Sequence, residues 1–96
     1  MVPEKIYYTR NPDYIFRRIV DEAVLVPIHK DVANMESIFT LNDVGAFIWE
    51  QLEQPATQNE LQLAIQEEFD ADQHVIAADL EDFLHEMITI GAVRRT

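Results

Sequence analysis

The chain of 96 residues is long enough for one domain with a modest core, and it is too short for a large enzyme with a deep cleft. It contains no cysteine, which excludes a disulfide framework and thiolate chemistry. Eighteen Asp and Glu outnumber seven Lys and Arg, and residues 31–93 hold no Lys or Arg, so this block would repel the phosphates of a nucleic acid. The chain has no membrane-length apolar run and no signal-peptide pattern, so we expect a cytoplasmic protein that does not bind a membrane.

The first part of the chain predicts three strands. Residues 1–13 are polar and include two prolines, so we expect a loose N-terminal arm before a single domain of residues 14–96. Tyr7 and Tyr8 could pack onto the body and order part of this arm. Tyr14–Val20 and Ala23–His29 are rich in the aromatic and β-branched residues typical of strands. Glu36–Leu41 alternates between apolar and polar residues, as a half-buried strand does. Because the connections are short, an antiparallel meander is expected.

The hydrophobic period changes from two to about 3.6 residues at Asn42, where the third strand leads directly into a helix. The side chain of Asn42 can accept a hydrogen bond from the free N–H groups of the first helical turn. Farther along, Thr57–Glu60 has the pattern of a capping box, which predicts a second helix that runs to about Phe69. A third helix is expected from about residue 74 to residue 90, followed by a glycine stop. The predicted fold class is therefore α+β, with a three-stranded antiparallel sheet followed by three helices in a winged helix-turn-helix-like order.

The third predicted helix carries more apolar surface than a core contact requires. Its apolar residues cover roughly 160° of arc, whereas a core-facing stripe needs about 100°. In one interpretation, a small domain simply wraps this helix deeply. In the other, the apolar flank formed by Ala77, Leu84 and Ile88 lines a groove, and Leu84 and Ile88 are then partly exposed when no ligand is bound.

No group of residues in the sequence has the pattern of a catalytic or metal-binding site. His74 and His85 share a helix face, but at 1.5 Å per residue they lie about 16 Å apart, which is too far for one metal ion. The acidic run around Glu67 and Asp70 lacks the alternating ligands and the central glycine of a calcium loop. We therefore expect a protein that is not an enzyme and that has no cofactor.

The order of strands and helices suggests a DNA-binding or transcription-regulator-like domain as one class of function. The third helix would then enter the major groove, which requires hydrogen-bond donors and positive charge. Residues 72–90 contain five acidic residues and no Lys or Arg. This charge distribution argues against nucleic acid as a partner.

A series of short motifs resembles the PqqD family over about residues 14–93. The motifs are Phe39-Thr40-Leu41-Asn42, Gly45-Ala46, Ile48-Trp49, Leu52, Thr57, Glu60-Leu61, Ile65, Glu68-Phe69-Asp70, Asp79-Leu80, Phe83-Leu84 and Gly91. The resemblance implies a recognition element for ribosomally synthesised and post-translationally modified peptides. The founding member of the family is a peptide chaperone of pyrroloquinoline quinone (PQQ) biosynthesis, which presents the leader of a precursor peptide to a radical S-adenosylmethionine (SAM) enzyme.

The resemblance also implies a binding site, in which the leader adds as a further strand beside the third strand and against the third helix. The expected partners are then a precursor leader peptide and a modifying enzyme such as a radical SAM protein. The expected peptide-binding residues are Glu36, Ser37, Ile38, Phe39, Thr40, Ala77, Leu80, Leu84 and Ile88. The first two strands and the loop Lys30–Met35 depart from the PQQ branch, so the resemblance leaves open whether the pathway is PQQ biosynthesis or another.

Overall fold

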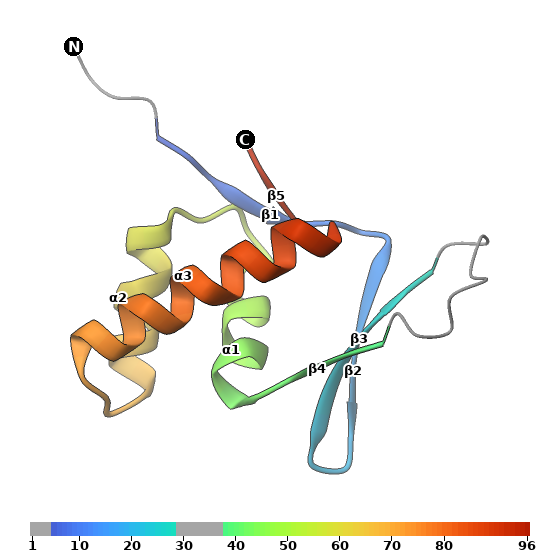
Figure 1. The fold of residues 1–96 in the computed structure, drawn as a ribbon, viewed down its shortest axis with the longest axis horizontal. Helices are drawn as coiled ribbons and strands as arrows, with labels where there is room; N and C mark the ends of the chain where they lie inside the picture. Colours follow the sequence, from blue (N-terminus) through green and yellow to red (C-terminus); the bar gives the residue numbers. More distant parts are fainter. Residues whose placement is uncertain (1–4, 29–37) are drawn as a thin grey trace.

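A computed structural model of the protein describes residues 5–28 and 38–96, in which three helices lie on one side of the molecule and a three-stranded sheet on the other (Figure 1). A second, two-stranded sheet lies along the same edge of the molecule as the end of the last helix. In chain order, the elements are β1 (Tyr8–Arg10), β2 (Tyr14–Ile19), β3 (Glu22–Pro27), β4 (Phe39–Leu41), α1 (Asp43–Gln51), α2 (Gln58–Glu68), α3 (Gln73–Ile90) and β5 (Val93–Arg95).

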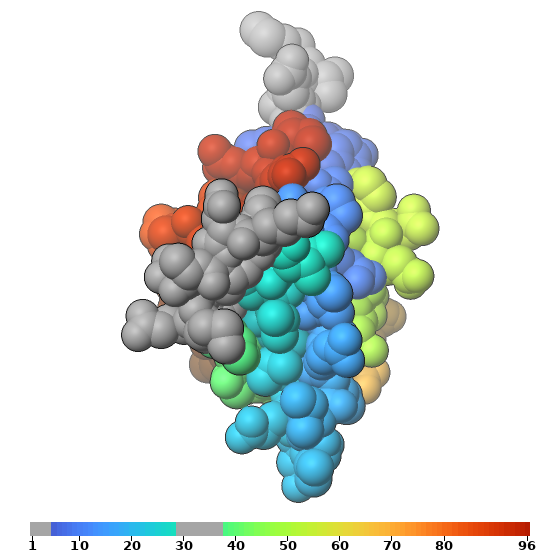
Figure 2. All heavy atoms as spheres, turned by 90° about the vertical axis from the view of Figure 1, so that its right-hand side faces the viewer, coloured from blue at the N-terminus to red at the C-terminus, as the bar shows by residue number. Residues whose placement is uncertain are grey.

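Strands β2, β3 and β4 form the antiparallel meander that the sequence predicts. Tyr14 lies opposite Pro27 in the β2–β3 pair, and Leu25 lies opposite Phe39 in the β3–β4 pair. The β2–β3 hairpin projects from the body of the molecule (Figure 2). The α+β prediction is therefore confirmed. The start of the predicted third strand at Glu36 and Ser37, and the predicted loop Lys30–Met35, lie outside the described residues.

The second sheet was not predicted, and it involves both ends of the chain. β1 pairs antiparallel with β5, and Tyr8 also exchanges two backbone hydrogen bonds with Ala56, at 2.8 and 3.2 Å. Tyr8 is 7% exposed and belongs to the core. Residues 8–10 are therefore part of the folded body and do not form a loose arm, and residues 93–95 form the second strand of this sheet. Pairing with a distant segment stabilises strand structure that the local sequence does not predict.

The predicted helix ends are confirmed within about one residue. The Asn42 side chain accepts a hydrogen bond from the backbone N–H of Gly45 at 2.7 Å. Thr57 and Glu60 form both hydrogen bonds of a capping box. Gly91 ends α3 with a φ of 87°, in the left-handed region that favours glycine.

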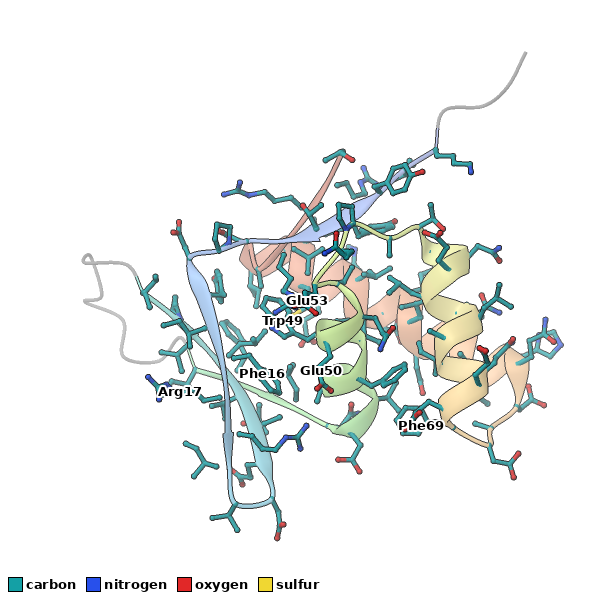
Figure 3. The ribbon with its side chains drawn as sticks, turned by 180° about the vertical axis from the view of Figure 1, so that it is seen from behind. Phe16, Arg17, Trp49, Glu50, Glu53 and Phe69 are labelled. Carbon is teal, nitrogen blue, oxygen red and sulfur yellow. The ribbon has the colours of Figure 1, made fainter. Side chains whose placement is uncertain are left out.

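The core lies around α1, which is enclosed by the sheet, α2 and α3. Trp49 is 1% exposed, and Figure 3 shows its side chain and that of Phe16 in the space between α1 and the sheet. The guanidinium of Arg10 lies over the Trp49 ring, 5.4 Å from the ring centroid. The described core consists of Tyr8, Ala23, Leu25, Leu41, Ala46, Ile48, Trp49, Leu52, Leu61, Ile65, Ile76, Leu80, Leu84, Met87, Ala92 and Val93.

Three hydrogen bonds tie the C-terminal end of α3 to the chain just before and at the start of β2. The Tyr14 hydroxyl donates to the carbonyl oxygen of Ile90 at 2.7 Å. The Asn11 side chain donates to the carbonyl oxygen of Gly91, and its backbone N–H donates to Ala92, both at 2.8 Å. These bonds hold one end of α3 against the sheet. They thereby help to set which side of α3 faces β4.

Among the described residues, no helix is long and apolar enough to cross a membrane.

Candidate functional site

β2 and β4 are the two edge strands of the three-stranded sheet, and β4 is the one that borders a cavity. β4 pairs with β3 on one side, and no other strand of the described residues pairs with it on the other side. The order is β2-β3-β4, so β4 is an edge strand. An edge strand presents backbone N–H and C=O groups that can pair with an added strand.

The hydrogen-bond alternation of the sheet shows which backbone groups of β4 point outward. The N–H of Ile28 donates to the carbonyl oxygen of Asp13 at 2.8 Å, so these residues form a hydrogen-bonded pair between the two chain segments of the hairpin. In an antiparallel pair, hydrogen-bonded and non-hydrogen-bonded positions alternate. The backbone N–H and C=O groups of every second residue of β3 therefore point toward β2. Those of the residues between them, Ala23 and Leu25, point toward β4.

Thr40 is consequently the residue of β4 whose backbone faces away from the sheet. Leu41 and Phe39 lie opposite Ala23 and Leu25 and form hydrogen-bonded pairs with them. The residue between them, Thr40, directs its N–H and C=O to the open edge. The sequence places the predicted site on this strand but does not determine this parity, because parity depends on the register with β3.

A cavity of about 260 Å³ lies beside this edge. It is enclosed by the end of β4, the first turn of α1 and one face of α3. Its lining residues are Thr40, Leu41, Asn42, Val44, Gly45, Ile48, Asp79, Asp82, Phe83 and Glu86. An extended segment that paired with Thr40 would therefore lie along this preformed cavity. We call the cavity the β4–α3 groove.

The floor of the β4–α3 groove is apolar. Val44 and Phe83 are half-buried, and both pack against the core. Gly45 lies directly beneath the Phe83 ring, so the absence of a side chain there lets α3 approach α1 closely. Partly exposed apolar surface of this kind gains free energy when a ligand side chain covers it.

The outer wall of the groove is acidic. Asp79, Asp82 and Glu86 lie at intervals of three and four residues, which places them on one face of α3. All three are exposed. Residues 31–93 contain no Lys or Arg, so the helices provide no permanent cation to neutralise these carboxylates.

The strand residues of the predicted site have distinct positions. Thr40 lines the groove, and its backbone forms the open edge. Phe39 is half-buried against the core, and Ile38, just before β4, is 58% exposed. Glu36 and Ser37 lie outside the described residues. The strand part of the prediction therefore includes the groove residue Thr40.

The α3 residues of the predicted site do not line the groove. Leu80 and Leu84 are 0% and 3% exposed and belong to the core. The groove interpretation of this flank, which required Leu84 to be partly exposed, is therefore wrong for Leu84, and the deep-wrapping interpretation holds there. Ala77 is half-buried, and Ile88 is 36% exposed. At about 100° per residue, Ala77 and Ile88 lie on one flank of the core stripe, and the groove lies on the other.

The residues that sequence analysis missed are the groove-lining carboxylates and the groove role of Phe83. Phe83 lies at the margin of the buried stripe of α3 and lines the groove. The carboxylates of Asp79, Asp82 and Glu86 lie on the same side of the helix, beyond Phe83. The available signal was their three- and four-residue spacing beside a phenylalanine, but periodicity does not say which element that face meets.

The described residues hold no group of three or more His, Cys, Asp or Glu that could bind a metal ion. His74 and His85 are both exposed on α3. The groove as described can bind through backbone hydrogen bonds, apolar contact and charge, and it shows no nucleophile beside a base.

Comparisons with known proteins identify a family and agree with the overall fold. The family model of coenzyme PQQ synthesis protein D (PqqD) matches residues 22–93, from β3 to the start of β5. No curated protein sequence matches the chain. Among solved structures, TbiB1 in complex with the TbiA(beta) leader peptide is similar, with a TM-score of 0.71 and 27% sequence identity over 90% of this chain and 94% of that one. Because the family model covers most of the chain, including the strand, helices and groove residues described above, the chain belongs to the PqqD family.

Proposed function

We propose that this protein is a non-catalytic recognition module, which binds the leader of a ribosomally synthesised precursor peptide and presents it to a modifying enzyme. The leader adds as a fourth strand along β4 and lies in the β4–α3 groove. The observation that carries the proposal is the open edge at Thr40 beside a cavity. A similar structure, that of TbiB1, is a complex with a leader peptide.

Strand addition explains how a small domain can bind a peptide without a deep pocket. The peptide main chain supplies hydrogen bonds to the outward N–H and C=O of Thr40, and alternate side chains enter the groove. This arrangement positions the leader and leaves the rest of the precursor free. The chemical step then belongs to the partner enzyme, of which a radical SAM protein is one kind.

A DNA-binding role has no support in the structure. The helix that would enter the major groove, α3, presents Asp79, Asp82 and Glu86 on its open face. DNA affinity rests on cationic contacts with phosphates, and these carboxylates would oppose them.

The proposed function is tested with two substitutions at Thr40. Thr40→Pro removes the outward N–H, whereas the matched variant Thr40→Ala removes only the side chain. We expect leader affinity to fall at least tenfold in Thr40→Pro and to change little in Thr40→Ala, measured by calorimetric titration with a synthetic leader peptide that binds the wild-type protein. Circular dichroism must show that both variants are folded. Normal affinity in a folded Thr40→Pro variant would place the peptide elsewhere.

A further inference from the structure

We infer that the leader selected by this protein is basic, with two Lys or Arg separated by one residue on the side chains that enter the β4–α3 groove. The inference rests on the proposed function, because it assumes that an extended peptide pairs with β4. The binding site is the groove with its open strand edge, and the acidic wall decides which peptides fit it. The wall consists of Asp79, Asp82 and Glu86.

The acidic wall is long enough to face two side chains of an extended peptide. With a rise of 1.5 Å per residue, Asp79 and Glu86 are about 10 Å apart along the axis of α3. An extended strand advances about 3.3 Å per residue, and its side chains point to the same face at every second position. Two consecutive groove-facing side chains, about 6.6 Å apart, therefore fit within the length of the wall.

The apolar floor of the groove also favours Lys and Arg side chains of the leader. Phe83 and Val44 form a partly exposed apolar surface below the carboxylates. Lys and Arg can lay their aliphatic stems on such a surface and keep the charged end in water at its rim. A leader with Asp or Glu at these positions would bring like charges together along the wall and would bind more weakly.

The negative charge of the wall has no ion-pair partner among the described Lys and Arg residues. Residues 31–93 contain no Lys or Arg, and the described cations of the C-terminal end, Arg94 and Arg95, lie on β5. No ion pair involves Asp79, Asp82 or Glu86 within the part of the chain that the structure describes. The three carboxylates thus remain available to a cationic partner, and their attraction weakens as salt screens it.

The test is a selection of random 12-residue peptides displayed on phage. Peptides are retained on the wild-type protein after removal of those that also bind Thr40→Pro, so that only peptides dependent on the strand edge remain. We expect Lys and Arg to be enriched at two positions separated by one residue, and Asp and Glu to be depleted there. Selection without such enrichment, among peptides that do depend on Thr40, would overturn the basic-leader inference and leave the proposed function intact.

Two charge variants then test, with one selected peptide, whether the groove carboxylates contribute to its affinity. The groove variant carries Asp79→Asn, Asp82→Asn and Glu86→Gln. The matched control changes the charge by the same amount at and just after the C-terminal end of α2. It carries Glu67→Gln, Glu68→Gln and Asp70→Asn, all at exposed positions. We expect the groove variant to lose about tenfold or more in affinity, and the control to lose about twofold or less.

The salt dependence separates charge recognition from general packing. Raising salt from about 50 mM to about 500 mM should weaken binding to the wild-type protein and to the control, and should have much less effect on the groove variant. Equal affinity of the groove variant and the wild type would overturn the inference. If no peptide depends on Thr40, the proposed function fails, and the inference fails with it.

Discussion

A methyl group at Gly45 would lie 3.0 Å from Cε1 of Phe83, which is closer than side-chain carbons normally approach. It would also lie 3.2 Å from Oδ1 of Asn42, the atom that caps α1. The lack of a side chain at Gly45 therefore affects both the packing of α1 against α3 and the shape of the β4–α3 groove. Phe83 is half-buried against the core and lines the groove, so we expect its ring to yield toward the groove.

The first prediction follows from this contact and concerns Gly45→Ala. Alanine is favoured over glycine inside a helix by about 1 kcal/mol, and the displacement of Phe83 offsets this gain. We expect the free energy of unfolding to change by less than about 1 kcal/mol, while leader affinity falls several-fold because the ring enters the groove.

The control for Gly45→Ala is the same substitution combined with Phe83→Leu, which removes the ring. In that background, Gly45→Ala should stabilise the protein by up to about 1 kcal/mol in urea unfolding, relative to Phe83→Leu alone. A single Gly45→Ala variant that is more stable and binds the leader normally would show that the contact does not shape the groove.

The second prediction concerns backbone hydrogen exchange in β4. The N–H groups of Phe39 and Leu41 pair with β3, and that of Thr40 points to the open edge. In the free protein, we expect the Thr40 amide to exchange with solvent much faster than the other two, as measured by nuclear magnetic resonance. Addition of the leader should slow exchange at Thr40 and leave the order of the other two unchanged. Protection of Thr40 in the free protein would contradict the assigned parity.

The third prediction separates two residues that sequence analysis grouped on one flank. Leu84 is buried, so Leu84→Ser should lower the free energy of unfolding by about 3 kcal/mol or more, through a lost apolar contact and a buried hydroxyl. Ile88 is 36% exposed, so Ile88→Ser should cost about 1 kcal/mol or less. Urea unfolding of both variants measures the difference. Similar costs at the two positions would contradict the orientation of α3.

The fourth prediction tests the link between the N-terminal segment and the end of α3. Asn11 is 8% exposed, and its side chain donates to Gly91 and accepts from the backbone N–H of Asp13. Asn11→Ala leaves both groups without this partner and should cost about 1–3 kcal/mol of stability. Tyr14→Phe removes one hydrogen bond, to Ile90, and should cost about 1 kcal/mol. If Asn11→Ala unfolds at the same urea concentration as the wild type, the segment before β2 does not hold α3 in place.

Local chemistry accounts for the features that the sequence alone predicted well. Asn42, the capping box at Thr57–Glu60 and Gly91 each satisfy backbone groups within a few residues of themselves, so their patterns mark helix ends without knowledge of the fold. The short connections between β2, β3 and β4 likewise restrict the sheet to an antiparallel meander. The order of these signals carries the resemblance to the PqqD family.

Distant pairing explains why the second sheet was missed. β1 and β5 have three residues each and lie at opposite ends of the chain. A three-residue strand has little pattern of its own, and its order comes from its partner. Tyr8 enters the core through this pairing, although it lies within a stretch that looks like a polar arm.

The side of α3 that forms the groove was decided only by tertiary packing. Helical periodicity gives the angles between residues such as Leu84 and Phe83, and it leaves the rotation of the whole helix about its axis undetermined. That rotation depends on the fit of Phe83 against Gly45 and on the hydrogen bond from Tyr14 to the end of α3. Both contacts join segments that are far apart in sequence. The resemblance carried by the sequence therefore predicted a peptide-binding strand at Glu36–Leu41, and the register with β3 made Thr40 its outward-facing residue. Packing placed Leu84 in the core and Asp79, Asp82 and Glu86 along the groove, because only contacts between distant segments can select one flank of a broadly apolar helix.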